Sequence, residues 1–240
     1  KTLSHLRLTG GEPLMSKHTW KLFEWFEKNK KEDLYFAINS NLVCKEELID
    51  KMLLASKNIG DFNVYTSCES VGTNAEYIRD GFDWKVWTSN FEKLVKNNVK
   101  MHSMCTIGAI SLPGLVEYLN WCLDQKKIYG KDVPTFTLNI QRFPTFQSPL
   151  VLPREIRNQF AIDLIDWKNQ ADQSLLHAME IEHVDRLIEY IKNENNQLGD
   201  DKYVNLLRQD FKKYYTQYDF RRNKNFEEVF PKLAEWYKQL

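Results

Sequence analysis

The chain has 240 residues, and its 33 basic and 33 acidic side chains give a formal net charge of zero. This balance argues against a nucleic-acid-binding surface, which normally carries a basic excess. No apolar run approaches the roughly 20 residues of a membrane span, and we find no signal peptide. We therefore expect a cytoplasmic protein with neither nucleic acid nor membrane as a partner. Because the first residue is Lys1 and not methionine, we also expect a piece of a longer protein.

From the start to about residue 145, short apolar runs alternate with amphipathic segments. The apolar runs are rich in β-branched and aromatic residues and predict strands. These are Leu3–Thr9, Leu34–Asn41, Asp61–Glu69, Val99–Gly108 and Pro134–Gln141. Apolar residues at helical spacing predict helices between them, which are Lys17–Asn29, Lys45–Ser56, Trp84–Asn97 and Leu112–Lys127.

Strands that alternate with helices through short links predict right-handed βαβ units and a parallel sheet, closed or open. After Pro149 the pattern becomes helical, with Pro153 at a helix start, Asn225 as an N-cap, and Pro231 as a break or restart. The sequence therefore predicts an α/β fold. Residues 1–148 would form a partial (β/α) TIM-like barrel of parallel strands, and residues 149–240 a C-terminal helical extension packed on it.

The four cysteines, Cys44, Cys68, Cys105 and Cys122, are widely separated and include no C-x-x-C pair. Sparse, unpaired cysteines are typical of a reducing compartment and predict free thiols. His177 and His183 lie six residues apart on a predicted helix, about 600° of rotation, so they do not share a face as metal ligands would. We expect no metal site in this sequence.

The stretch "LRLTGGEPLM", from Leu6 to Met15, leaves a predicted strand through two glycines. Adjacent glycines indicate either positive φ angles or a ligand close to the backbone. Ligands bind parallel sheets at the carboxyl ends of the strands, where Glu12 would suit an ammonium group and Pro13 would stiffen the turn. The alternative is a structural turn with an exposed glutamate.

Strand–GGEP–helix resembles the radical S-adenosylmethionine (SAM) enzymes, in which this motif holds the SAM amino group. Further segments resemble the family in its order along the chain. They are "AINSN" at the third barrel strand, "SCESVG" at the fourth with Glu69 in place of aspartate, "AEYIRDGFDW" after it, "MCTIG" at the fifth and "LNIQRFP" at the sixth. The closing "DFRRNKNFEEVFP" resembles the tail of twitch-domain, SPASM-like members.

The resemblance implies a set of SAM-binding residues. The Gly10–Glu12 turn would hold the ammonium group, and Arg79 would form a bidentate pair with the carboxylate. Ser67 and Glu69, two apart on a predicted strand, would share a face, with Cys68 packed behind them. The full set is Gly10, Gly11, Glu12, Pro13, Asn39, Ser67, Glu69, Arg79, Thr106 and Asn139.

The family's cluster-binding CxxxCxxC lies upstream of GGEP, and only nine residues precede Gly10 here. The resemblance therefore implies the C-terminal part of an enzyme whose 4Fe–4S ligands lie outside this sequence. The intact protein would cleave SAM reductively to a 5′-deoxyadenosyl radical, which abstracts hydrogen from a substrate such as a peptide or protein. This fragment alone would be inactive. The alternative is a non-catalytic barrel remnant or accessory module that binds a nucleotide-like ligand or a partner protein.

Overall fold

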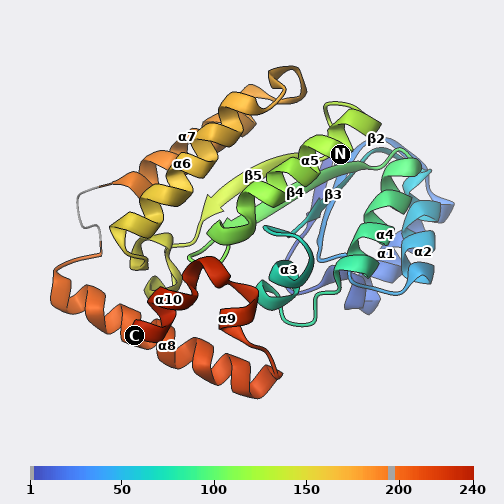
Figure 1. Ribbon diagram of the computed structural model, residues 1–240. Coiled ribbons are helices and arrows are strands. Elements are labelled where there is room, and N and C mark those ends of the chain that lie inside the picture. The colour runs from blue at the N-terminus through green and yellow to red at the C-terminus, as the bar shows by residue number, and fades with distance from the viewer. Residues whose placement is uncertain (1–2, 194–197) are drawn as a thin grey trace.

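The computed structural model describes residues 3–193 and 198–240, and its central feature is one parallel sheet of five strands (Figure 1). The strands lie in chain order, so each βαβ crossover joins neighbours. They are β1 (His5–Leu8), β2 (Lys31–Ser40), β3 (Ile59–Thr66), β4 (Lys100–Ile107) and β5 (Thr135–Ile140). The predicted parallel α/β architecture with five strands is confirmed.

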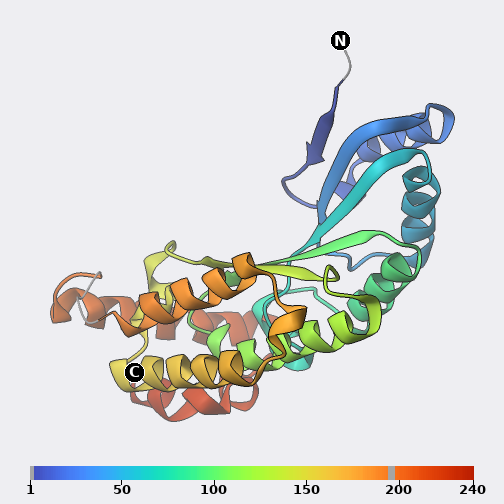
Figure 2. The same cartoon turned by 90° about the horizontal axis from the view of Figure 1, so that it is seen from above.

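The first five α-helices and two short 3-10 turns occupy the connections between the strands. They are η1 (Pro13–Met15), α1 (Lys17–Lys28), α2 (Glu46–Ser56), α3 (Gly72–Ile78), α4 (Trp84–Lys96), η2 (Leu112–Gly114) and α5 (Leu115–Tyr129). Figure 2 shows the sheet curved like a trough, with helices on its convex side. The strands bury every second residue against these helices, as Phe36 and Ile38 do on β2.

The opposite, concave side of the trough carries the alternate residues, which are mostly polar. On β4, for example, Met101 and Cys105 are buried against the helices, whereas His102, Met104 and Thr106 face the concave side. Figure 2 shows no helix lying over this side between β1 and β4. The fold is therefore an open, incomplete barrel whose interior face is accessible.

The region after β3 differs from the sequence prediction in two ways. Strand β3 ends at Thr66, so Ser67 to Glu69 form a connecting loop and not the end of a strand. The loop leads directly into α3, a helix of 7 residues that the sequence analysis did not predict. A helix of one or two turns is too short for its pattern of apolar residues to be recognised from sequence.

The C-terminal helices follow two more 3-10 turns, η3 (Thr145–Gln147) and η4 (Pro149–Val151). They are α6 (Arg154–Gln170), α7 (Ala178–Lys192), α8 (Asp201–Arg222), α9 (Phe226–Val229) and α10 (Pro231–Gln239), with η5 (Gln173–Leu175) before α7. As predicted, Asn225 caps α9 by accepting from two backbone amides, and a new helix starts at Pro231.

The C-terminal helices pack in two groups. Helices α6 and α7 pair and lie beside the edge strand β5 (Figure 1). Helices α8 to α10 pack on segments that follow the carboxyl ends of the strands: Tyr77 of α3 donates to Asp219, and Lys232 donates to Pro113 O of η2. One hydrophobic core runs through both the sheet and these helices. Within the described ranges, no helix combines the length and apolar character that crossing a membrane requires.

Candidate functional site

The turn after β1 takes its shape from two glycines in the left-handed region, Gly10 with φ +89° and Gly11 with φ +54°. Residues with a Cβ rarely adopt these angles, which explains the glycine pair. A Cβ built on either residue would meet no atom within 4 Å. Both residues are exposed, so the backbone of this turn is open to a ligand.

Glu12 is fixed by three hydrogen bonds at the carboxyl ends of β1 and β2. Its Oε1 accepts from Ser40 Oγ at 2.8 Å and from Leu14 N at 3.1 Å, and its Oε2 accepts from Asn41 N at 2.7 Å. A carboxylate has about four acceptor positions, so one remains for an ammonium group. Pro13 is buried at the start of η1, where its fixed φ stiffens the turn.

Three further candidate residues face the concave side near the ends of strands β2, β4 and β5. Asn39 on β2 accepts from Arg7 Nε at 2.9 Å. Thr106 on β4 and Asn139 on β5 are exposed and occupy paired positions in the register. Because all strands are parallel, these residues lie toward the same end of the sheet as the Gly10–Glu12 turn.

The loop after β3 places Glu69 and Arg79 in contact. The expected common face of Ser67 and Glu69 is wrong, because the strand ends before them: Ser67 is half-buried, Cys68 is fully buried and Glu69 is 4% exposed. Arg79, which caps the end of α3, donates from Nε to Glu69 Oε2 at 2.8 Å. The guanidinium therefore already has a carboxylate partner within the chain.

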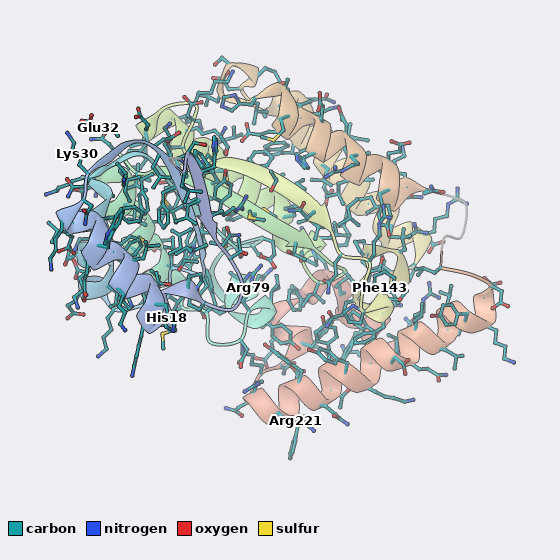
Figure 3. All side chains as sticks on the ribbon, turned by 180° about the vertical axis from the view of Figure 1, so that it is seen from behind. His18, Lys30, Glu32, Arg79, Phe143 and Arg221 are labelled. Atoms are coloured by element: carbon teal, nitrogen blue, oxygen red, sulfur yellow. The ribbon has the colours of Figure 1, made fainter. Side chains whose placement is uncertain are left out.

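The electrostatics of this pair are those of a buried carboxylate beside a partly exposed arginine. Burial raises the pKa of Glu69, and this outweighs the opposite effect of Arg79. Burial also opposes the charge on Arg79, but the Glu69 carboxylate more than compensates and raises the pKa of Arg79. Figure 3 shows Arg79 on the side of the sheet that faces the C-terminal helices.

The concave face carries a second group of residues that the sequence analysis missed. Arg7 of β1 lies over the Tyr65 ring, with its guanidinium carbon 4.1 Å from the ring centre. His102 of β4 stacks on the same ring at a centroid distance of 4.4 Å, and the Tyr65 and Tyr35 hydroxyls hydrogen-bond at 2.9 Å. The two-residue alternation of the strands was the signal that could have identified these residues.

Hydrogen bonds on both ring nitrogens fix His102 in one neutral form. Asn63 donates to Asp61, so its Oδ1 accepts from His102 Nε2 at 2.8 Å. Nδ1 then accepts from Thr135 Oγ1 at 2.6 Å. Burial lowers the pKa of His102 to about 4. The imidazole is therefore a neutral structural link between β3, β4 and β5.

The described residues contain no group of three or more His, Cys, Asp or Glu side chains suited to a metal ion. All four cysteines are free thiols. Burial raises the pKa of Cys44 to about 11 and that of Cys68 to about 12, so neither thiol provides a thiolate near neutral pH.

The two candidate histidines lie apart. His177 precedes α7 as its N-cap and does not lie within the helix, and its Nε2 is 2.9 Å from Asp132 Oδ1. His183 lies against β5, with Nδ1 3.2 Å from Leu138 O. The two histidines thus belong to different surroundings, His177 beside Asp132 and His183 beside the backbone of β5.

The site fits one end of SAM but not the iron–sulfur cluster. The open backbone of Gly10 and Gly11 and the Glu12 carboxylate suit an ammonium group. Clusters require closely spaced thiolates, and the described part of the chain offers none. No described residue is therefore assigned as a cluster ligand.

No protein-family model matches the sequence, and no curated protein matches it. One solved structure that resembles the chain is a crystal structure of a domain of pyruvate-formate lyase-activating enzyme from Bacteroides vulgatus ATCC 8482. The TM-score is 0.48 and the sequence identity 14%, over 68% of this chain and 94% of that one. A likeness this distant identifies no activity for this chain.

Proposed function

We propose that this chain is the C-terminal portion of a radical SAM enzyme. The observation that carries the proposal is the GGEP turn: it follows a parallel strand, leaves its backbone open, and holds Glu12 between the ends of β1 and β2. The turn lies at the end of the sheet where ligands of such folds bind, and this position supports a role in binding a zwitterion, as do the segments that resemble the family in order.

In this proposal the chain binds and orients SAM. The carbonyl groups of the Gly10–Gly11 turn and the Glu12 carboxylate receive the ammonium group. Arg79 binds the carboxylate through its terminal nitrogens, while its Nε remains on Glu69. Glu69 thus acts as a positioning residue for the guanidinium. The proposed contacts with the rest of the cofactor are Ser67, Asn39, Thr106 and Asn139.

The chemistry comes from the cofactors. When SAM and a 4Fe–4S cluster are bound, they supply a 5′-deoxyadenosyl radical for hydrogen abstraction. The cluster cysteines of this proposal lie outside the sequence, and a peptide or protein is the proposed substrate. The competing hypothesis is a non-catalytic module that binds a nucleotide-like ligand or a partner protein.

The test is SAM binding and cleavage by the full-length protein after anaerobic cluster reconstitution. Arg79→Lys keeps a positive charge beside Glu69 but loses the planar fork, and we expect SAM affinity to fall about 10-fold in calorimetry. Glu12→Gln should weaken binding less, because backbone carbonyl groups share the ammonium. Arg221→Lys, at the exposed end of α8 (Figure 3), is the matched control.

The outcomes separate the two hypotheses. Formation of 5′-deoxyadenosine from SAM supports the enzyme. Binding that depends on Arg79 and Glu12 without any cleavage supports the non-catalytic module. Equal SAM affinity in Arg79→Lys, Arg221→Lys and the parent would show that Arg79 serves only to pair with Glu69.

A further inference from the structure

Two strong hydrogen-bond donors on the concave face converge on one weak acceptor. Arg7 Nη2 lies 3.5 Å and Asn39 Nδ2 lies 3.3 Å from the Met104 Sδ atom. A thioether sulfur is a poor acceptor for a guanidinium and an amide. The two donors are nevertheless held in place, because Arg7 Nε donates to Asn39 Oδ1 at 2.9 Å. Both donors point to a position that an oxygen acceptor would fill better.

Arg7 is also a cation without an anionic partner. Among the residues that the structure describes, no carboxylate forms an ion pair with it, and only Nε and Nη2 donate hydrogen bonds. The Tyr65 ring beneath the guanidinium orients it without neutralising its charge. Lys100, the other cation on this part of the face, is paired with Asp61 at 2.8 Å. Among the described residues on this part of the face, Arg7 is therefore the cation that no carboxylate matches, and it lies beside the neutral His102.

A cavity of about 410 Å³ adjoins these donors. Its walls combine aromatic and thioether groups with hydroxyl groups: they include Tyr65, His102, Met104, Thr135, Thr137 and Met179. Tyr65 and Met104 belong both to this cavity and to the surroundings of Arg7, so the two features are continuous. Such walls suit a small molecule whose main part, its body, is uncharged and that carries a polar group at one end.

We propose that Arg7 and Asn39 recognise a carboxylate monoanion whose uncharged body occupies the adjoining cavity. One carboxylate oxygen takes the place of Met104 Sδ between Arg7 Nη2 and Asn39 Nδ2, and the second accepts from the remaining guanidinium N–H groups. The site shares Asn39 with the residues proposed to surround SAM, but its binding of a carboxylate is measured without SAM and without cleavage. That the bound molecule is the substrate rests on the proposed function.

The charge balance favours a carboxylate over a phosphate. A phosphate monoester carries more than one negative charge near neutral pH, and the face offers a single unmatched cation. Asp132 also lines the cavity and would repel additional negative charge. The planar guanidinium with parallel N–H donors matches the geometry of a carboxylate.

The experiment titrates the chain with 3-phenylpropionate and with 3-phenylpropanamide, which has the same body without the charge. Binding is measured by calorimetry, and the site is located from the NMR signals of Arg7 Nε–H and the Asn39 side-chain amide. We expect the carboxylate to bind and to shift both signals. Arg7→Gln should weaken binding at least 10-fold, Arg7→Lys should recover part of it, and the amide should bind at least 10-fold more weakly than the carboxylate.

Arg221→Gln is the control, because Arg221 lies exposed in the last turn of α8 (Figure 3), and this variant should bind the carboxylate as the parent does. Failure of 3-phenylpropionate to bind, equal binding to Arg7→Gln, or tighter binding of phenyl phosphate would overturn the proposal. Displacement of the probe by S-adenosylhomocysteine would overturn the assignment to a substrate, because the carboxylate would then be the cofactor's. SAM cleavage plays no part in this measurement, so either proposal can fail while the other stands.

Discussion

The two edge strands of the sheet, β1 and β5, differ in what their outward-facing backbone groups bond to. At the β5 edge, Glu180 Oε1 of α7 accepts from Phe136 N at 2.9 Å, and Arg186 Nη2 donates to Leu138 O at 2.8 Å. Side chains of a helix thus supply the hydrogen bonds that a sixth strand would have made. An edge strand covered in this way presents no template for further pairing.

The β1 edge has no such cover in the described chain. β1 pairs with β2 alone, and its residues alternate between exposed and half-buried. Beside it lies a cavity of about 500 Å³ whose lining includes the apolar residues Leu3, Leu6, Leu22 and Trp25. Figure 2 shows β1 at the open end of the trough, away from the C-terminal helices.

The two edges differ in how their charged side chains are paired and in how far these are exposed to solvent. The β5 edge is held by buried charge: Lys126 and Glu180 pair at 2.8 Å with both side chains 0% exposed. Lys126 also donates to Lys131 O and Leu175 O, so all three of its hydrogens are used. The β1 edge carries its charge on exposed Arg7, which no carboxylate of the described residues neutralises. We therefore expect substitutions at β5 to cost stability and those at β1 to alter binding.

The largest effect should follow from Glu180→Gln. The amide keeps the size of the side chain, but it leaves the Lys126 ammonium buried without a counter-charge. Breaking a buried pair in this way typically costs about 3–5 kcal/mol of the free energy of unfolding. Urea denaturation followed by circular dichroism measures the change.

Asp124→Asn provides the matched control for Glu180→Gln. Asp124 pairs with Lys127 on the same helix as Lys126, but the two side chains are 62% and 60% exposed, so its loss should cost less than about 0.5 kcal/mol. Adding Lys126→Met to Glu180→Gln should recover much of the lost stability, because no buried charge remains. A cost of under about 1 kcal/mol for Glu180→Gln would mean that α7 holds the β5 edge by apolar packing alone.

Acid should weaken the β5 half of the sheet through His102. Its folded pKa, about 4, lies below the ordinary value of 6.5 because burial disfavours the charged ring. A depressed folded pKa gives stability that is present above pH 6.5 and is lost as the pH falls toward 4. Allowing for partial solvent exposure, we expect a loss of about 2 kcal/mol.

His102→Gln removes the titrating group and tests this assignment. We expect the difference in unfolding free energy between about pH 7 and about pH 4.5 to be smaller in the variant than in the parent by most of that 2 kcal/mol. The same pH dependence in parent and variant would place the acid sensitivity in other groups.

Arg186→Gln tests the second of the two hydrogen bonds that α7 side chains form with the backbone of β5. The exposed arginine bonds one backbone carbonyl, so its loss should cost about 1 kcal/mol of the free energy of unfolding. Glutamine is shorter and does not reach Leu138 O in the same way. Arg222→Gln, an exposed arginine that pairs with Asp80 on the surface, is the control and should cost less. Equal costs for the two variants would show that His183 Nδ1, 3.2 Å from the Leu138 carbonyl oxygen, or solvent serves that carbonyl as well as Arg186 does.

The sequence predicted the sheet because five strands of apolar, β-branched composition alternate with helices that have clear caps and faces. It also located the Gly10–Glu12 turn, since two adjacent glycines and a glutamate at a strand end are unusual. The pairing of Arg79 with Glu69 was not predicted, because the loop between β3 and α3 brings together residues that no periodicity relates. The role of Arg7 was not predicted either. It follows from contacts with Asn39, Tyr65 and Met104, which lie on three other strands and are brought together only by the register of the sheet.

The smallest effect on stability should come from Arg7→Gln at the β1 edge. Arg7 is exposed, and its partners are an amide oxygen, a thioether and the face of Tyr65, so its loss should change the free energy of unfolding by less than about 0.5 kcal/mol. Ser4 O accepts from Tyr35 N, so in a parallel pair the amides of His5 and Arg7 face away from β2. We expect these amides to exchange hydrogen rapidly, whereas Phe136 N–H should be protected by Glu180, although it too lies on an edge strand. A cost above about 1 kcal/mol for Arg7→Gln, or slow exchange at His5 and Arg7, would show that the β1 edge is as firmly held as the β5 edge.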